Sequence, residues 1–190
     1  MQLVNKPFIF MRHGETQANQ NNVFCGATDI PLNGIGKQQA IDAQKRIAAL
    51  KMDGVTVVSS SMLRAVETTE LALPNIAFTT DTDLSERNWG DLELQPITKQ
   101  VCYLETPPGG EPWELFITRV TKALNRILSA YESPMIVAHS GVYRAIQFHL
   151  IGTPSGPRVP NATPIRFWPE SYGWKQKIID EHTNKERNKG

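Results

Sequence analysis

The sequence predicts an α/β fold with three layers, in which helices cover both faces of a mainly parallel sheet. Strand and helix patterns alternate along the chain, which is typical of parallel strands joined by helical crossovers. The apolar runs at residues 8–11 and 135–138 are continuous rather than alternating. Such runs indicate strands that are buried on both faces, as in the interior of a parallel sheet.

The first half of the chain is expected to hold three strands and two helices. After the opening strand and a polar stretch, residues 35–50 predict an amphipathic helix, because their apolar side chains recur at spacings of three and four. These side chains are Ala40, Ala43, Ile47 and Leu50. Residues 55–58 are rich in β-branched side chains and predict a second strand. A helix follows over 62–73, with N-cap candidates in the serines at 59–61, and then a short strand at 75–79.

The second half begins with an irregular segment and then returns to regular elements. Residues 81–112 are polar and rich in glycine, proline and acids, and long stretches of this kind inside a domain are often functional, so we expect a lid-like segment. A helix is expected over 113–131, where one apolar stripe recurs at helical spacing. The remaining expected elements are a strand at 135–138, a helix at 142–151 and a terminal hairpin formed by 165–168 and 174–179.

Length and composition indicate one domain, 1–190, with a flexible charged tail at 180–190. A formal net charge of +1 gives no basic field for nucleic acid. The chain has no signal-peptide-like start, and its apolar runs are too short to cross a bilayer. Its two cysteines, Cys25 and Cys102, show neither paired nor zinc-ligating spacing. We therefore expect a cytoplasmic protein that has no metal, no other cofactor, and neither nucleic acid nor membrane as a partner.

Two of the expected strands end in a histidine that is followed closely by a glycine, at residues 13–14 and 139–141. A third strand precedes a helix with an arginine in its first turn. Parallel strands share one carboxyl edge, where ligands of open α/β sheets bind, so these polar side chains are expected to face one crevice. The side chains expected there are Arg12, His13, Arg64 and His139.

This combination of side chains suits phosphoryl transfer. Guanidinium groups bind phosphate oxygens bidentately and stay charged at every relevant pH. A neutral imidazole can attack phosphorus and carry the group covalently, and a second, protonated histidine would add positive charge. An acid is also needed to protonate the leaving oxygen, and composition leaves the choice open. The candidates in the irregular segment are Asp81, Asp83, Glu86, Asp91, Glu93, Glu105 and Glu111.

Ordered blocks of the sequence resemble the histidine phosphatase superfamily, whose fold is the phosphoglycerate mutase-like one. The first block is Arg-His-Gly-Glu-Thr at 12–16, with an asparagine at 19, and the last is Val-Ala-His-Ser-Gly at 137–141. Between them lie similar blocks at 24–26, 60–65, 84–87 and 108–111. The resemblance covers residues 7–165 in the order that is usual for the family.

The resemblance implies roles for individual residues. His13 would be the nucleophile, passing through a phosphohistidine, and Glu86 would protonate the leaving group and later help to activate water. Arg12, Arg64 and His139 would complete the phosphate pocket. Further contacts with the substrate are expected from Asn19, Cys25, Gly26 and Ser140. No metal is implied, and the oligomeric state stays open.

Within this family the phosphoryl group goes to water in a phosphatase, or back to a sugar acid in a mutase. Cofactor-dependent phosphoglycerate mutases place extra basic residues between the acid block and the Gly-Gly-Glu block, whereas Lys99 is the only cation in residues 88–111. We therefore expect a metal-independent phosphomonoester hydrolase acting on a small phosphorylated metabolite. A phosphoglycerate mutase is the alternative, and a non-catalytic phosphate-binding module is a third possibility. The apolar side chains of 89–104 either contact the rest of the substrate or simply pack the loop onto the domain.

Overall fold

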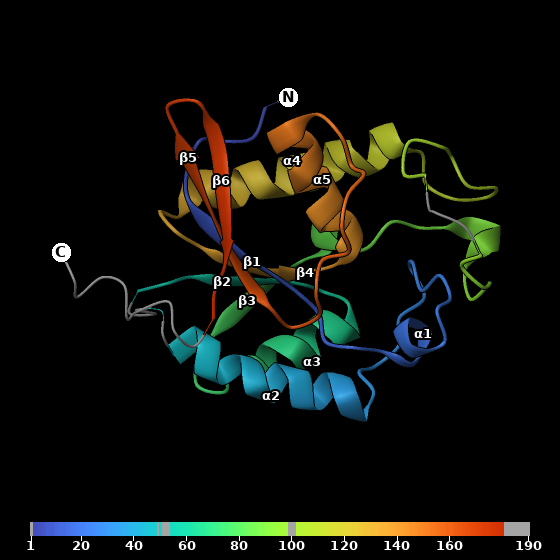
Figure 1. The fold of residues 1–190 in the computed structure, drawn as a ribbon, viewed down its shortest axis with the longest axis horizontal. Coiled ribbons are helices and arrows are strands. Elements are labelled where there is room, and N and C mark those ends of the chain that lie inside the picture. The colour runs from blue at the N-terminus through green and yellow to red at the C-terminus, as the bar shows by residue number, and fades with distance from the viewer. Residues whose placement is uncertain (1, 49, 51–53, 99–101, 181–190) are drawn as a thin grey trace.

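The computed structural model describes residues 2–48, 50, 54–98 and 102–180, and it shows a six-stranded sheet between layers of helices (Figure 1). The strands are β1 (Phe8–Arg12), β2 (Val57–Ser60), β3 (Phe78–Asp81), β4 (Met135–Ala138), β5 (Pro164–Glu170) and β6 (Gly173–Ile178). Their order across the sheet is β3-β2-β4-β1-β5-β6. The first four strands run parallel, and β5 and β6 form an antiparallel hairpin at one edge. The predicted fold class and the terminal hairpin are confirmed.

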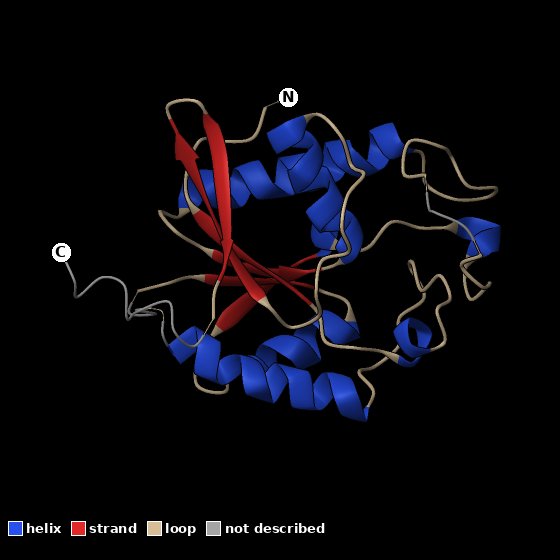
Figure 2. Cartoon of the chain, viewed as in Figure 1, coloured by secondary structure: helices blue, strands red, loops and turns tan. Residues whose placement is uncertain are grey.

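Helices lie on both faces of this sheet (Figure 2). They are α1 (Gln17–Gln20), α2 (Gly34–Ala48), α3 (Leu63–Ala72), α4 (Trp113–Ala130) and α5 (Ser140–Ile151), with short 3-10 turns η1 (Thr82–Leu84) and η2 (Gly90–Leu92). Side chains alternate between the faces along β1. Phe8 and Phe10 pack with α4 and α5, whereas Ile9 and Met11 pack with α2. None of the described helices is long and apolar enough to cross a membrane.

Two strands extend further toward their carboxyl ends than the hydrophobic pattern predicts. The pattern predicts strands at 55–58 and 75–79, whereas β2 reaches Ser60 and β3 reaches Asp81. The final residues of both strands are polar, so a pattern of hydrophobic residues does not detect them. The prediction that the serines at 59–61 cap the next helix is wrong, because the N-cap of α3 is Met62, whose side chain makes no capping hydrogen bond.

The described residues of the segment 81–112 are irregular, as predicted, apart from η1, η2 and the last residue of β3. Lys99 and residues 181–190 of the expected flexible tail lie outside the described residues. Cys25 and Cys102 are both free thiols.

Two glycines allow the start of α2 to pack tightly against the turn that follows β1. A Cβ atom at Gly36 would lie 2.0 Å from the carbonyl oxygen of Glu15, and one at Gly14 would lie 2.5 Å from the carbonyl oxygen of Gly36. The side chain of Asn33 accepts a hydrogen bond from the amide of Gly36 at 2.8 Å and so caps the helix. This packing fixes the turn that carries the first functional residues.

Replacing Gly36 by alanine should lower the free energy of unfolding by roughly 2 kcal/mol, because the new Cβ collides with backbone atoms. Gly34 is the matched control, since it begins the same helix and a Cβ there meets nothing within 4 Å. Gly34→Ala should change the free energy of unfolding by less than about 0.5 kcal/mol. Urea unfolding of both variants measures the difference, and equal losses would contradict the packing argument.

Candidate active site

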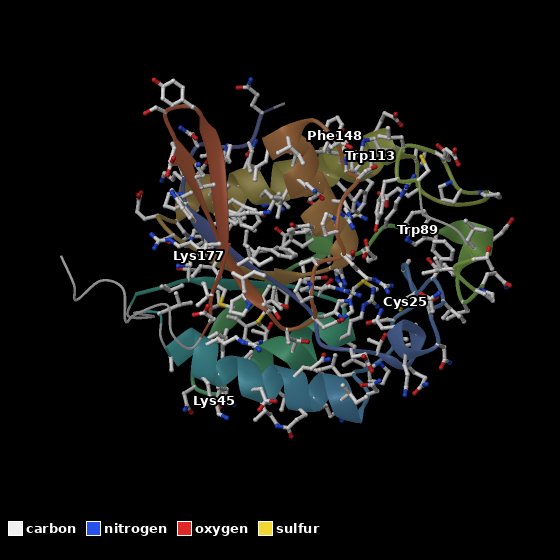
Figure 3. The ribbon with its side chains drawn as sticks, in the orientation of Figure 1. Cys25, Lys45, Trp89, Trp113, Phe148 and Lys177 are labelled. Atoms are coloured by element: carbon white, nitrogen blue, oxygen red, sulfur yellow. The ribbon has the colours of Figure 1, made fainter. Side chains whose placement is uncertain are left out.

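The carboxyl ends of β1, β2 and β4 form one edge of the sheet, and the loops beyond them enclose a cleft of about 290 Å³. The amide of His13 donates to the carbonyl of Ala138 at 2.9 Å, so the residues that follow β1 and β4 lie side by side. Cys25 and Trp89 both line the cleft and lie at this end of the sheet (Figure 3). The cleft therefore lies where ligands of open α/β sheets bind.

The structure brings the predicted side chains together at this cleft. Its lining includes Arg12, His13, Asn19, Cys25, Gly26, Arg64, Glu86 and Ser140. His139 lies behind them, fully buried, and its ring centroid is 5.2 Å from that of His13. Residues from six separate segments of the chain thus gather at one place.

His13 is held in a defined tautomer. Its Nδ1 lies 2.7 Å from the carbonyl oxygen of Gly14. Because a carbonyl only accepts hydrogen bonds, Nδ1 carries the proton and Nε2 keeps its lone pair. Burial, together with the charges of Arg64 and Arg12, holds the pKa of His13 well below its ordinary value. The ring is therefore neutral at pH 7, in the form that a nitrogen nucleophile requires.

The two arginines beside His13 are held by backbone carbonyls rather than by strong ion pairs. Arg12 donates to the carbonyl of Val159 at 3.0 Å, and Arg64 donates to the carbonyls of Gly26 and Thr28 at 2.8 and 3.0 Å. Burial and the neighbouring Arg158 lower the pKa of Arg12 to about 10, so this side chain stays charged at pH 7. Both guanidinium groups keep donors for an anion.

Three buried polar atoms around His13 have no hydrogen-bond partner among the described residues. They are Nε of Arg12, Nε of Arg64 and Nδ1 of His139. Buried polar atoms are rarely left unpaired, because losing water without a replacement partner costs free energy. A tetrahedral anion with several acceptor oxygens would satisfy such a cluster of donors. This cluster of side chains is therefore suited to an oxyanion.

His139 differs from the protonated second histidine that the sequence analysis expects. Its Nε2 lies 2.8 Å from the hydroxyl oxygen of Ser60, which ends β2. Burial and the charge of Arg64 hold the pKa of His139 well below its ordinary value. The lowered pKa favours the neutral ring, whereas the sequence favours a protonated one, and the role of His139 in the site stays a prediction.

Glu86 is fixed at the start of α5, which borders the cleft. The amide of Gly141 donates to both carboxylate oxygens at 3.1 and 3.0 Å, and the amide of Arg87 donates to Oε1 at 2.8 Å. A Cβ at position 141 would lie 2.0 Å from Oε1, so only glycine permits this approach. Glu86 is 9% exposed and lines the same cleft as His13 and the two arginines.

The other acids of the irregular segment have different partners or positions. Asp81 and Asp83, at the start of the segment, form ion pairs with Arg126 at 2.6 and 3.2 Å. Glu111 pairs with an arginine of α4 at 2.7 Å, and Glu93 accepts hydrogen bonds from three backbone amides of the adjoining loops. Of the seven candidate acids, Glu86 is the one in the cleft lining. No group of three or more His, Cys, Asp or Glu side chains within the described ranges is arranged to hold a metal ion.

One buried and one half-buried arginine fix the irregular segment against the rest of the site. Arg87 donates to the backbone carbonyls of Tyr103, Glu105 and Glu111, at 2.7, 2.8 and 2.9 Å. Arg119 on α4 donates to the carbonyls of residues 83, 85 and 86, at 2.9, 2.9 and 3.1 Å. The position of Glu86 thus depends on contacts from outside its own loop.

The structure also places residues at the site that sequence reasoning did not single out. Asn161 donates to the carbonyl of His13 at 2.8 Å, and Arg144 and Arg158 line the cleft. Arg144 lies one helical turn after Ser140, so the spacing of four offered a signal for it. Arg158 and Asn161 lie in the irregular segment between α5 and β5, where no periodic pattern offered a signal.

Most of the chain matches one known protein family. The family model of the histidine phosphatase superfamily (branch 1) matches residues 8–175. The chain belongs to this superfamily. A solved histidine phosphatase-fold structure, the α-ribazole phosphatase from Shigella flexneri, has a TM-score of 0.75 at 23% identity and covers 91% of this chain and 95% of that one. At that identity, the similarity shows the shared fold.

Relatives of this chain carry different names. The uncharacterized phosphatase PhoE of Bacillus subtilis (strain 168) is 30% identical over 186 residues, which are 90% of this chain and 94% of that protein. A 2,3-bisphosphoglycerate-dependent phosphoglycerate mutase of Cytophaga hutchinsonii is 29% identical over 163 residues, or 75% of this chain and 76% of that one. An agropine synthesis reductase of Rhizobium rhizogenes is 35% identical over 152 residues, but the chain spans only 34% of its length.

The state of His13 can be tested without an activity assay. Because its pKa is lowered from the ordinary value of 6.5, the ring should stay neutral as the pH falls through that value and gain its proton only at more acidic pH. Long-range ¹H–¹⁵N spectra should show a protonated Nδ1 and a bare Nε2 at about pH 6. The variant His13→Gln assigns the signal. A protonated Nε2 in the neutral ring, or a midpoint at or above 6.5, would rule out the assigned tautomer and its cause.

Proposed function

We propose that this histidine phosphatase is a metal-independent phosphomonoester hydrolase, which acts on a small phosphorylated metabolite through a phosphohistidine on His13. The observation that carries the proposal is the tautomer of His13. The carbonyl of Gly14 accepts a hydrogen bond from Nδ1–H, which leaves the lone pair on Nε2 in a cleft that also holds Arg12 and Arg64. A non-catalytic binding module would require neither an activated nucleophile nor a carboxyl group beside it.

The first step transfers the phosphoryl group to the protein. Nε2 of His13 attacks phosphorus, the bond between phosphorus and the ester oxygen breaks, and Glu86 gives its proton to the departing alkoxide. Arg12 and Arg64 hold the equatorial oxygens, whose charge must be stabilised during transfer. The unpaired Nδ1 of His139 is available to a further oxygen of the same group.

The second step returns the site to its starting state. Glu86 is now a carboxylate and takes a proton from water as the water oxygen attacks phosphorus. The bond between phosphorus and Nε2 breaks, and inorganic phosphate leaves with the neutral imidazole restored. Asn19, Cys25, Gly26 and Ser140, which line the same cleft, would contact the substrate.

We prefer hydrolysis to mutase activity because the chain matches a phosphatase over more of its length than it matches a mutase. The similarity to the phosphatase PhoE covers nearly both whole chains, whereas that to the mutase covers about three quarters of each. The expected shortage of positive charge between the acid block and the Gly-Gly-Glu block does not extend to the whole cleft. Arg144 and Arg158 reach it from α5 and the following loop. A mutase therefore stays the second candidate.

His13→Ala should abolish turnover of p-nitrophenyl phosphate, because the covalent intermediate has no other acceptor. Labelled phosphate should be trapped on the wild-type protein as an acid-labile, base-stable adduct and be absent from the variant. A chelator should not change the rate. Lys45→Ala, which removes a charge on α2 far from the cleft (Figure 3), is the control and should behave as wild type. Near-normal rates in His13→Ala would remove the phosphohistidine step, and inhibition by the chelator would remove the metal-free mechanism.

Isomerisation of 3-phosphoglycerate separates the two candidate activities. With 2,3-bisphosphoglycerate added, release of inorganic phosphate should exceed formation of 2-phosphoglycerate, because the proposed second step uses water as acceptor. The reaction without 2,3-bisphosphoglycerate is the control. Isomerisation that outpaces phosphate release would favour the mutase.

A further inference from the structure

Four arginines and one glutamate are the charged side chains that line the cleft. The arginines are Arg12, Arg64, Arg144 and Arg158, and the glutamate is Glu86. Arg12 and Arg64 together match the two negative charges of a phosphate monoester. The other two arginines are in excess of what that group requires, in a chain whose formal net charge is only +1.

Arg144 is 7% exposed and yet has no carboxylate partner among the described residues. Its terminal nitrogens donate to the side-chain oxygen of Gln147 at 2.8 Å and to the carbonyl of Gly156 at 3.0 Å. Its Nε is buried without a hydrogen-bond partner in the described part of the chain. A buried cation costs free energy unless a negative group compensates it. This side chain is therefore suited to meet an anion in the cleft.

Arg158 lies in the loop that follows α5, two residues after Gly156. It is exposed, lines the cleft, and enters none of the ion pairs formed by the described residues. The loop is attached to α5 twice, because Gln147 donates to the carbonyl of Ser155 at 3.2 Å and Arg144 donates to that of Gly156. Helix α5 thus holds the segment that carries this second positive charge.

An apolar wall completes the cleft and includes the side chains of Val23, Phe24, Trp89 and Ile97. Residues 22–24 form hydrogen bonds with residues 94–97, which joins the loop after α1 to the irregular segment. The rings of Phe24 and Trp89 are 5.1 Å apart. The aliphatic and aromatic carbon atoms of this wall do not pair with an anion, so Arg144 and Arg158 would orient a substrate that carries a second anionic group.

We propose that Arg144 and Arg158 form a second anion subsite, so that the substrate is a phosphomonoester whose alcohol part carries a carboxylate or a second phosphate. This inference rests on the proposed function for the reaction itself, but the subsite would bind such a group whether or not hydrolysis follows. The scissile phosphate occupies the pocket of His13, and the second anion lies toward the 154–158 loop.

Two matched substrate pairs test the subsite. 3-Phosphoglycerate and glycerol 3-phosphate differ by a carboxylate, and fructose 1,6-bisphosphate and fructose 1-phosphate differ by a phosphate. The wild-type protein should favour the member with two anionic groups in at least one pair. The expected preference is roughly tenfold in kcat/KM, which corresponds to the contribution of one charge-assisted hydrogen bond. The pair that shows the preference identifies the anion. Arg158→Ala should remove most of the preference, so kcat/KM should fall more for the member with two anionic groups than for the member with one.

Lys45→Ala is the control, since it removes the same charge away from the cleft and should keep the preference (Figure 3). The inference is overturned if the wild type shows no preference in either pair, or if Arg158→Ala slows both members of a pair equally.

A binding experiment distinguishes a failure of the subsite from a failure of the proposed hydrolysis. Calorimetry on His13→Ala should show the same preference in Kd, and its loss in His13→Ala/Arg158→Ala, even if no substrate is hydrolysed. Equal Kd values within both pairs would reject the subsite independently of catalysis.

Discussion

The site depends on the charge of Arg64, a buried guanidinium whose hydrogen bonds are to backbone carbonyls. Its side chain is 1% exposed, and the nearest carboxylate, Asp29, is 3.9 Å away at the surface. Carbonyl oxygens orient a cation but do not neutralise it, so its field acts on its neighbours in a medium of low dielectric. That field helps to keep His13 and His139 neutral, and it leaves positive charge for an incoming phosphate.

Arginine performs a second task throughout this fold, which is to hold loops that lack regular hydrogen bonding. Backbone carbonyls in irregular segments need donors, and a guanidinium offers five in a rigid fork. Arg64 holds the loop at 26–28, Arg87 holds residues 103–111, and Arg119 holds the loop of Glu86. The same type of side chain therefore positions both the phosphate pocket and the segments that surround it.

The sequence predicted the sheet and the centre of the site because both follow from strong local patterns. Continuous apolar runs ended at His13 and His139, and parallel topology then requires those ends to meet. Composition could not choose Glu86 among seven acids, because the choice depends on contacts with Gly141 and Arg119, which are distant in the sequence. The protonation state of His139 could not be predicted from the sequence for a related reason. The pKa depends on burial and on neighbouring charges, which no spacing of residues reveals.

The distribution of the site between sheet and loops explains why one family can include enzymes with different names. Residues at strand ends and helix starts form the pocket that we propose for the phosphoryl group, and the rigid sheet sets their mutual geometry. The outer cleft is lined by the loops at 22–28, 89–98 and 154–158. The first two are joined by hydrogen bonds and a ring contact, and the third is held by side chains of α5. Loops tolerate changes in length and composition far better than a buried parallel sheet does. Substitution in these loops would therefore alter the alcohol that is accepted, and the access of water, without altering how the phosphoryl group is transferred.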